Sequence, residues 1–293
     1  MQEADPIAQQ VMPLKKKRSP AGLRLLSAVV VIGAVAAGVL VWRTAMRPAR
    51  EGTPVAPAQA PPGTPRPAAA ASAARHPIAL AVPAAASTAP LPALDASDAD
   101  VAGALLGLAG DDAFAALLHR DQIIRRIVAT VDALPRQSVA TEILPVRTPK
   151  GALLVERTDG SITLSPRNAE RYAPYLQVVQ KVDPKALVAW YVRHYPLFQQ
   201  AYRDLGYPKG YFNDRLVVAI DDMLAAPEPP APLQLQQPKV FFRYADADLE
   251  ARSAGQKMLM RLGPAGEAQV KSKLRALRGL LTGSVLPAAS SVH

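Results

Sequence analysis

The feature that most constrains this chain is a run of 18 uncharged residues near its N-terminus. It extends from Leu25 to Trp42 and reads LLSAVVVIGAVAAGVLVW. As a helix rising 1.5 Å per residue, it would be about 27 Å long, close to the hydrocarbon thickness of a bilayer. Backbone polar groups inside lipid can bond only to each other, so the run must be helical there. We therefore expect one transmembrane helix at residues 23–42.

Two other interpretations of this run fit less well. A buried core helix normally keeps a polar face, and here Ser27 is the one polar side chain between Leu25 and Trp42. A cleaved signal peptide needs small residues at its cleavage site, and the exit WRTAMRPAR places Arg43 there instead. We therefore expect an uncleaved anchor.

Basic residues flank the run unequally, five before it and three after it. They are Lys15, Lys16, Lys17, Arg18 and Arg24 on one side and Arg43, Arg47 and Arg50 on the other. The excess of basic residues marks the cytoplasmic side of a bacterial inner membrane protein. We therefore expect residues 1–22 to be a cytoplasmic basic tail and the C-terminal part of the chain to be periplasmic.

A Pro/Ala-rich stretch follows the anchor. From Pro48 to Pro92 the chain has 11 Pro and 16 Ala. Proline blocks helix propagation, and alanine offers too little apolar surface to drive collapse. We expect residues 43–91 to be a disordered linker of polyproline II character, residues 92–283 a soluble helix-rich domain, and residues 284–293 a frayed tail.

The charge distribution argues against a nucleic-acid partner. The formal charge is +10, but residues 1–92 account for +7 of it and residues 93–293 for only +3. A domain so close to neutral lacks the basic surface of a duplex-binding protein. The chain also has no cysteine, which excludes disulfides, thiolate metal sites and a cysteine nucleophile.

Local signals predict a mainly helical α+β domain with a small antiparallel β element. Expected helix starts are Ser97 or Asp98, Asp111, a helix capped by Asp121, Ser165-Pro166, Asp183-Pro184 and a helix at 214–224. We expect Pro196 to kink or break the helix that begins at Pro184. Two final helices are expected at 247–262 and 265–281, separated by Gly263-Pro264.

The β element is predicted around an Asp159-Gly160 turn. Two β-rich runs flank this dipeptide within residues 152–164 and predict a hairpin. Residues 233–236 and 239–244 have strand character too, and we expect them to extend the same sheet.

Four stretches of the soluble part resemble the bacterial family known as domain of unknown function 3014. They are LPALDASDADV at 91–101, LSPRNAERYAPY at 164–175, YPLFQQAYRDLGYPKGYFNDRLVVAIDDML at 195–224 and PKVFFRYADADLEARSAGQKMLMRLGP at 238–264. The resemblance covers residues 91–281 and implies the layout of anchor, linker and domain. It implies no activity, cofactor or catalytic residue.

The richest stretch for a binding site runs from residue 207 to residue 222. The candidate binding residues in it are Tyr207, Tyr211, Asn213, Asp214, Arg215 and Asp221. An aromatic loop with two glycines is a suitable recognition surface, because tyrosine combines apolar area with a polar tip. The alternative is that its tyrosines fasten the loop to the core.

Asp214 and Asp221 are seven residues apart and share one side of the predicted helix. Two such carboxylates could serve as general acid and base, or bind a hard cation. The simpler interpretation is that Asp214 complements the helix dipole, Arg215 pairs locally, and Asp221 accepts hydrogen bonds. A periplasmic hydrolase that uses this pair is therefore the alternative function.

The remaining polar residues give no reaction signature. The sequence has no HExxH, GxSxG or P-loop motif, and we assign no cofactor, metal or catalytic residue. His194 is expected to be a structural histidine among core aromatics. Basic residues on the last helix suggest either a solvated face or contact with anionic lipid or an acidic partner, and they are Lys271, Lys273, Arg275 and Arg278. An envelope interaction module is the preferred function, and an enzyme the less favoured one.

Overall fold

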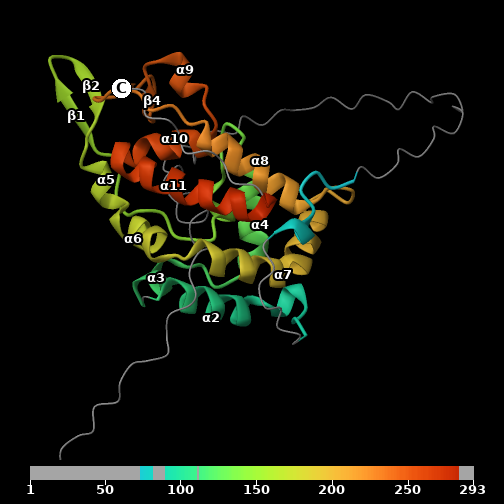
Figure 1. Ribbon diagram of the computed structural model, residues 1–293. Coiled ribbons are helices and arrows are strands. Elements are labelled where there is room, and N and C mark those ends of the chain that lie inside the picture. The colour runs from blue at the N-terminus through green and yellow to red at the C-terminus, as the bar shows by residue number, and fades with distance from the viewer. Residues whose placement is uncertain (1–72, 82–89, 111, 284–293) are drawn as a thin grey trace, which may run out of the picture.

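The computed structural model describes residues 73–81, 90–110 and 112–283 (Figure 1). The expected cytoplasmic tail, transmembrane helix, C-terminal tail and most of the expected linker lie outside these ranges. Within them, no helix combines the length and the apolar character that crossing a bilayer requires.

Helices dominate the described part and form one body, with a small sheet at one end (Figure 1). The longer helices are α2 (Asp98–Ala109), α4 (Ile123–Ala133), α6 (Ala173–Lys181), α7 (Pro184–Asp204), α8 (Phe212–Leu224), α10 (Ala254–Arg261) and α11 (Gly263–Thr282). The shorter ones are α3 (Asp112–Leu117), α5 (Asn168–Arg171) and α9 (Ala247–Glu250), with 3₁₀ turns η2 (Ile78–Leu80), η3 (Leu94–Ala96) and η4 (Thr141–Ile143). The predicted mainly helical α+β domain is confirmed.

The sheet has four antiparallel strands in the order β1-β2-β3-β4. They are β1 (Val155–Thr158), β2 (Ser161–Leu164), β3 (Gln234–Gln236) and β4 (Arg243–Tyr244). Asp159 and Gly160 both have positive φ, 49° and 75°, as a two-residue hairpin turn requires. Ile162 of β2 pairs with Leu235 of β3, so the predicted extension of the hairpin by the later strands is confirmed.

The core lies where α4, α7, α8 and α11 meet. The apolar face of α4 is buried, from Ile123 to Val131. Three aromatic rings fill the space between α7 and α8: Phe198 stacks on Phe212 at 5.5 Å, and Tyr191 meets Phe198 edge-on at 5.3 Å. Each such buried ring contributes about 1.5–3 kcal/mol through removal of apolar area from water.

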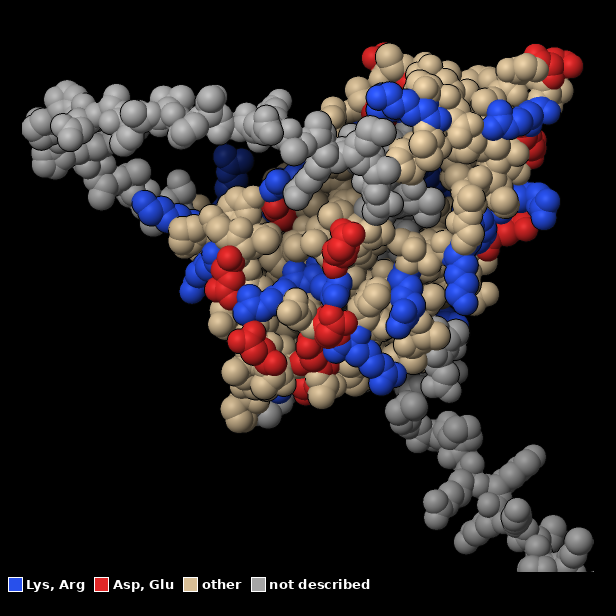
Figure 2. Space-filling model, turned by 180° about the vertical axis from the view of Figure 1, so that it is seen from behind, with Lys and Arg blue, Asp and Glu red and all other residues tan. Residues whose placement is uncertain are grey.

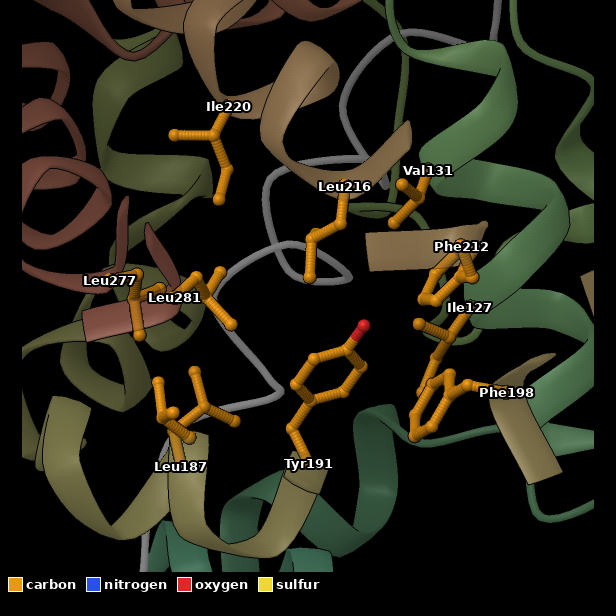
Figure 3. Close-up of a pocket in the computed structure, with 11 residues that line it drawn as sticks. Ile127, Val131, Leu187, Tyr191, Phe198, Phe212, Leu216, Ile220, Leu277 and Leu281 are labelled. Atoms are coloured by element: carbon orange, nitrogen blue, oxygen red, sulfur yellow. The ribbon is translucent and has the colours of Figure 1, made fainter. Parts of the chain in front are cut away.

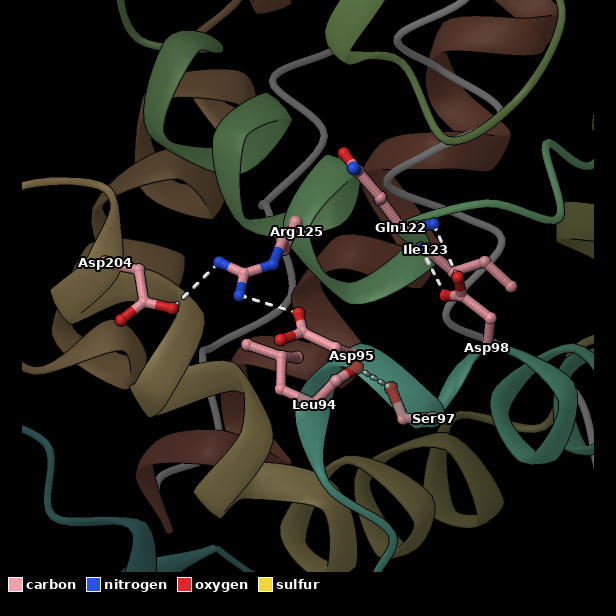
Figure 4. A network of polar contacts seen from close by, with 8 residues as sticks. All are labelled: Leu94, Asp95, Ser97, Asp98, Gln122, Ile123, Arg125 and Asp204. Atoms are coloured by element: carbon pink, nitrogen blue, oxygen red, sulfur yellow. Dashed lines mark hydrogen bonds and ion pairs between the residues drawn. The ribbon is translucent and has the colours of Figure 1, made fainter.

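The cap of α4 differs from the prediction. The side chain of Asp98, from α2, accepts the backbone N–H groups of Gln122 at 2.7 Å and Ile123 at 2.8 Å (Figure 4). Asp121, which the sequence suggests as the cap, pairs with Arg126 instead. The cap therefore comes from a residue 25 positions before Ile123, because α2 packs across the start of α4.

An arginine on α4 also joins segments that are distant in sequence. Arg125 pairs with Asp95 of η3 at 2.9 Å and with Asp204 at the end of α7 at 2.8 Å (Figure 4). With the Asp98 cap, these contacts fasten residues 94–109 to the rest of the helical body.

The helices differ from the prediction at two places. Helix α7 continues through Pro196 to Asp204, so the proline does not break it, because apolar residues on both sides of the proline are buried and offset the lost hydrogen bond. The helix expected at 247–262 is divided into α9 and α10. Ser253 makes the division, since its hydroxyl caps α10 by accepting from Gln256 N at 3.1 Å and donates to Asp222 at 2.6 Å.

Candidate functional site

The side chain of Gln199 holds the loop between α7 and α8, residues 205–211, in place. Gln199 of α7 donates to the carbonyl of Gly210 at 2.7 Å and accepts from the backbone N–H of Phe212 at 2.9 Å. The hydroxyl of Tyr195 donates to the same Gln199 oxygen at 2.9 Å and orients the amide. The amide of Gln199 thus determines the loop conformation on both sides of Tyr211.

Tyr207 is held against the domain. Its ring stacks on Tyr202 with 4.6 Å between centroids and an interplanar angle of 15°. Its hydroxyl accepts from Arg136 at 2.8 Å and donates to Asp132 at 3.3 Å. Of the two interpretations of this tyrosine, the structure supports the one in which it fastens the loop.

Tyr211 is placed differently. It is 38% exposed, and Leu205, at the other end of the loop, is 43% exposed. Between them Pro208 and Lys209 are exposed as well. The loop therefore presents two large apolar or aromatic side chains to solvent from a backbone that is fixed.

Arg215 belongs to a charge cluster centred on Asp132, a residue that the sequence did not single out. Arg215 Nε lies 3.0 Å from Asp132 Oδ1, an ion pair in which the N–H does not point at that oxygen. Arg136 pairs with the other carboxylate oxygen. The spacing of Asp132 and Arg136, one helical turn, was a signal for this pair; the contact with Arg215 has no local signal.

Asn213 and Asp214 contact a distant part of the chain. The carboxylate of Asp214 accepts the backbone N–H groups of Arg75 at 3.0 Å and His76 at 2.7 Å. Asn213 donates to the carbonyl of His76 at 2.8 Å. Residues 73–81, which the composition assigned to the linker, therefore lie against the domain here.

Asp221 has a separate partner. It forms a bidentate ion pair with Arg278 of α11, in which Arg278 Nη2 lies 3.2 Å from Asp221 Oδ2. Asp214 and Asp221 thus bind different groups and do not face a common pocket. The arrangement gives no support to an acid–base pair, because such a pair must converge on one reacting group.

Two cavities of the described part lie apart from these residues. One is a small apolar cavity of about 30 Å³ in the core, lined by side chains of α4, α7, α8 and α11 around Tyr191 (Figure 3). It is large enough for a water molecule but not for an organic ligand. Burial raises the pKa of Tyr191 well above its usual value, so this hydroxyl stays neutral.

The second cavity is a groove of about 610 Å³. Its walls are the β2–α5 connection, the Pro-rich segment 228–233 and the α10–α11 junction. The volume is in the range of ligand sites. None of the six candidate residues lines either cavity, so the groove and the loop are separate features.

The contacts of His194 bear on the prediction that this histidine is structural. His194 is buried, stacks on Trp190 at 4.6 Å and has a ring nitrogen 2.8 Å from the Trp190 carbonyl. Its other nitrogen lies 3.2 Å from Asp100 of α2. These contacts agree with a structural histidine that joins α7 to α2. Within the described ranges, no group of three or more His, Asp or Glu residues is arranged to hold a metal ion.

The basic residues of α11 are largely engaged within the domain. Lys271 is buried and lies 2.8 Å from both Glu228 and Glu267. Lys273 donates to the carbonyl of Val182 at 2.6 Å. With Arg278 bound to Asp221, three of the four basic side chains stabilise the fold, which corrects the expectation of a solvated basic face.

Charges of both signs are mixed on the surface that Figure 2 shows. On the face in Figure 2, basic and acidic side chains of the described residues are interspersed. This distribution agrees with the small net charge of residues 93–293.

Comparison with known proteins identifies the family. The family model described as "Protein of unknown function (DUF3014)" matches residues 123–278, from the first residue of α4 to the last turns of α11. The match covers more than half of the chain and includes all six candidate residues. No curated protein and no solved structure matches the chain. The resemblance seen in the sequence is thus confirmed over residues 123–278, while the stretch at 91–101 lies outside the match. The chain belongs to the DUF3014 family.

Proposed function

We propose that this protein is an interaction module of the bacterial cell envelope. An N-terminal helix holds it in the inner membrane, and a Pro/Ala-rich tether displays the domain in the periplasm, where it binds a protein partner. The observation that carries the binding function is the fixed loop at 205–211, which keeps Leu205 and Tyr211 exposed.

A fixed loop favours binding for an energetic reason. Association costs free energy when mobile side chains and backbone become ordered, and a loop already held in one conformation avoids part of that cost. Gln199 and the stacked Tyr202–Tyr207 pair provide this order before any partner arrives. Tyrosine adds a large contact area with two side-chain torsions, which is why it is enriched at interface hot spots.

The binding role is tested by crosslinking in cells followed by purification of the full chain. Tyr211→Ala should abolish recovery of a reproducible partner. Val240→Ala is the matched control, because Val240 is 69% exposed in another loop and should leave recovery unchanged. Equal recovery with both variants would refute the loop assignment. Tyr207→Ala is unsuitable as a probe, because it also removes the contacts that hold the loop.

Membrane display is tested separately. A reporter fused after His293 that is active only outside the cytoplasm should be active. Activity of a cytoplasm-specific reporter at the same position would contradict the proposed orientation, which depends on the five-to-three excess of basic residues around the anchor.

The positions of Asp214 and Asp221 do not favour the hydrolase alternative. Its two carboxylates are committed to different partners, Asp214 to the backbone of residues 75–76 and Asp221 to Arg278.

A further inference from the structure

Residues 73–81 cross from the start of α8 to the end of α11 (cyan in Figure 1). At the first position, Asp214 accepts two successive backbone N–H groups, and Asn213 donates to the carbonyl that follows them. At the second, the carbonyl of Leu80 lies close to Gly283, where an added Cβ would be 3.3 Å from it. The segment is therefore hydrogen-bonded to the domain at its first end and packed close to it at its second.

The polar end of this contact is organised by the core. Asn213 has no exposed surface, and its side-chain oxygen accepts from the hydroxyl of the buried Tyr191 at 3.2 Å. This bond leaves the Asn213 amide N–H₂ directed at the His76 carbonyl. Asp214 lies in the first turn of α8, where its charge also favours the helix dipole. The Asn213 donor is thus held in place by the core and not by the segment that it binds.

At the second end of the segment, apolar side chains are buried against the core. After Pro77 the chain makes the 3₁₀ turn η2, and Ile78 packs half-buried against the core. Ala81 follows with only 2% of its surface exposed. All three hydrogen bonds at the other end go to backbone atoms of residues 75 and 76, so recognition there does not depend on those two side chains.

We propose that Asn213 and Asp214 form a peptide-binding site whose ligand is this chain's own segment 73–81. The ligand is an extended dipeptide that offers two N–H groups and a carbonyl, followed by a proline turn and a small apolar residue. The segment acts as a strap that fixes where the N-terminal part of the chain leaves the domain.

The strap changes the geometry of display, and this consequence rests on the proposed function. With the strap bound, residues 43–72 separate the anchor from the domain and reach about 90 Å if extended as polyproline II. If the expected linker 43–91 were wholly free, the same estimate would give about 150 Å. The Asn213–Asp214 site therefore limits how far the domain can move from the membrane.

Hydrogen exchange measured by mass spectrometry on the full chain tests the strap. In the unmodified protein, the peptide that contains Arg75 and His76 should exchange about 10-fold or more slowly than the same synthetic peptide free in solution. Asp214→Ala should remove most of this protection. Asp221→Ala is the matched control on the same helix, and it should leave the protection intact because its partner is Arg278.

A second variant guards against indirect effects of the first. Ala81→Arg places a large charged side chain where 2% exposure leaves no room. It changes neither Asn213 nor Asp214, nor the residues 75 and 76 that are hydrogen-bonded to them. It should release the same peptide while the exchange of α8 stays unchanged. Unprotected strap amides in the unmodified protein, or equal protection in all variants, would overturn the proposal. Partner recovery that depends on Tyr211 would survive that result, so the two proposals fail separately.

Discussion

Replacing Asp98 by alanine tests how the N-terminal helices are joined to the family domain. The Asp98 carboxylate binds two N–H groups at the start of α4, which otherwise have no partner within that helix. Loss of a helix cap costs about 0.5–2 kcal/mol, and bonds to a charged acceptor lie in the upper part of that range. The bond from Gln122 is exposed, so water can replace the acceptor there, but the bond from the fully buried Ile123 is partly buried and is harder for water to replace.

We therefore expect Asp98→Ala to destabilise the domain by about 1–2 kcal/mol. For a domain of this size, that corresponds to a fall in Tm of roughly 2–8 °C, measured by circular dichroism or calorimetry. Asp98→Asn keeps one acceptor oxygen and should cost less.

Asp121→Ala is the informative control for this experiment. Asp121 is the residue that the sequence alone suggests as the cap, but in the structure it is exposed and pairs with Arg126. Exposed ion pairs contribute little, so its removal should change Tm much less than Asp98→Ala does. A larger loss from Asp121→Ala, or no loss from Asp98→Ala, would refute the capping of α4 from α2.

Three further variants test the interior and the loop. Lys271→Met should cost about 3–5 kcal/mol, because it leaves the buried carboxylate of Glu267 unpaired. Burial raises the pKa of Glu267, so the folded state holds that proton more tightly than the unfolded state and stability falls as pH rises through the raised pKa. The Tm difference from the unmodified protein should therefore be larger at pH 7 than at pH 5. Gly210→Ala would place a Cβ 2.9 Å from Tyr202 Cε1, so a loss of about 1–3 kcal/mol in urea unfolding and a changed near-UV circular dichroism spectrum are expected. Tyr207→Phe keeps the stacking but loses two hydrogen bonds and should cost about 1 kcal/mol in the same assay.

Elements with short-range signals could be predicted from the sequence. Asp183 caps α7 through Lys185 N at 3.0 Å, and Gly110 ends α2 in the left-handed conformation. The Asp159-Gly160 hairpin has the same character. In each case the responsible side chain and the backbone group it serves lie within a few residues, so the local preference decides the structure.

Features that depend on long-range packing could not be predicted. The cap of α4 comes from Asp98, and the linker composition around Arg75 gave no indication that Asp214 would bind its backbone. Propensity describes the chain near a residue, whereas these contacts depend on which surfaces meet after folding. The uninterrupted helix around Pro196 is a similar case, since tertiary burial outweighs the local cost.

The six candidate binding residues stay a prediction, and the structure shows how they are arranged. It brings Tyr207 and Arg215 together through Asp132. It does not bring Asp214 and Asp221 to a common pocket, because sharing one side of a helix leaves each free to meet a different neighbour.

We propose that the loop at 205–211 presents its exposed residues Leu205 and Tyr211 to a protein partner. The most direct test of this proposal is site-specific photo-crosslinking of the full chain in its own membrane, with the photoreactive residue in place of Leu205, Tyr211 or Val240. We expect the same protein adduct from positions 205 and 211, and we expect no such adduct from Val240, the exposed control. An identical adduct pattern at all three positions, or no protein adduct from the loop, would contradict the proposal.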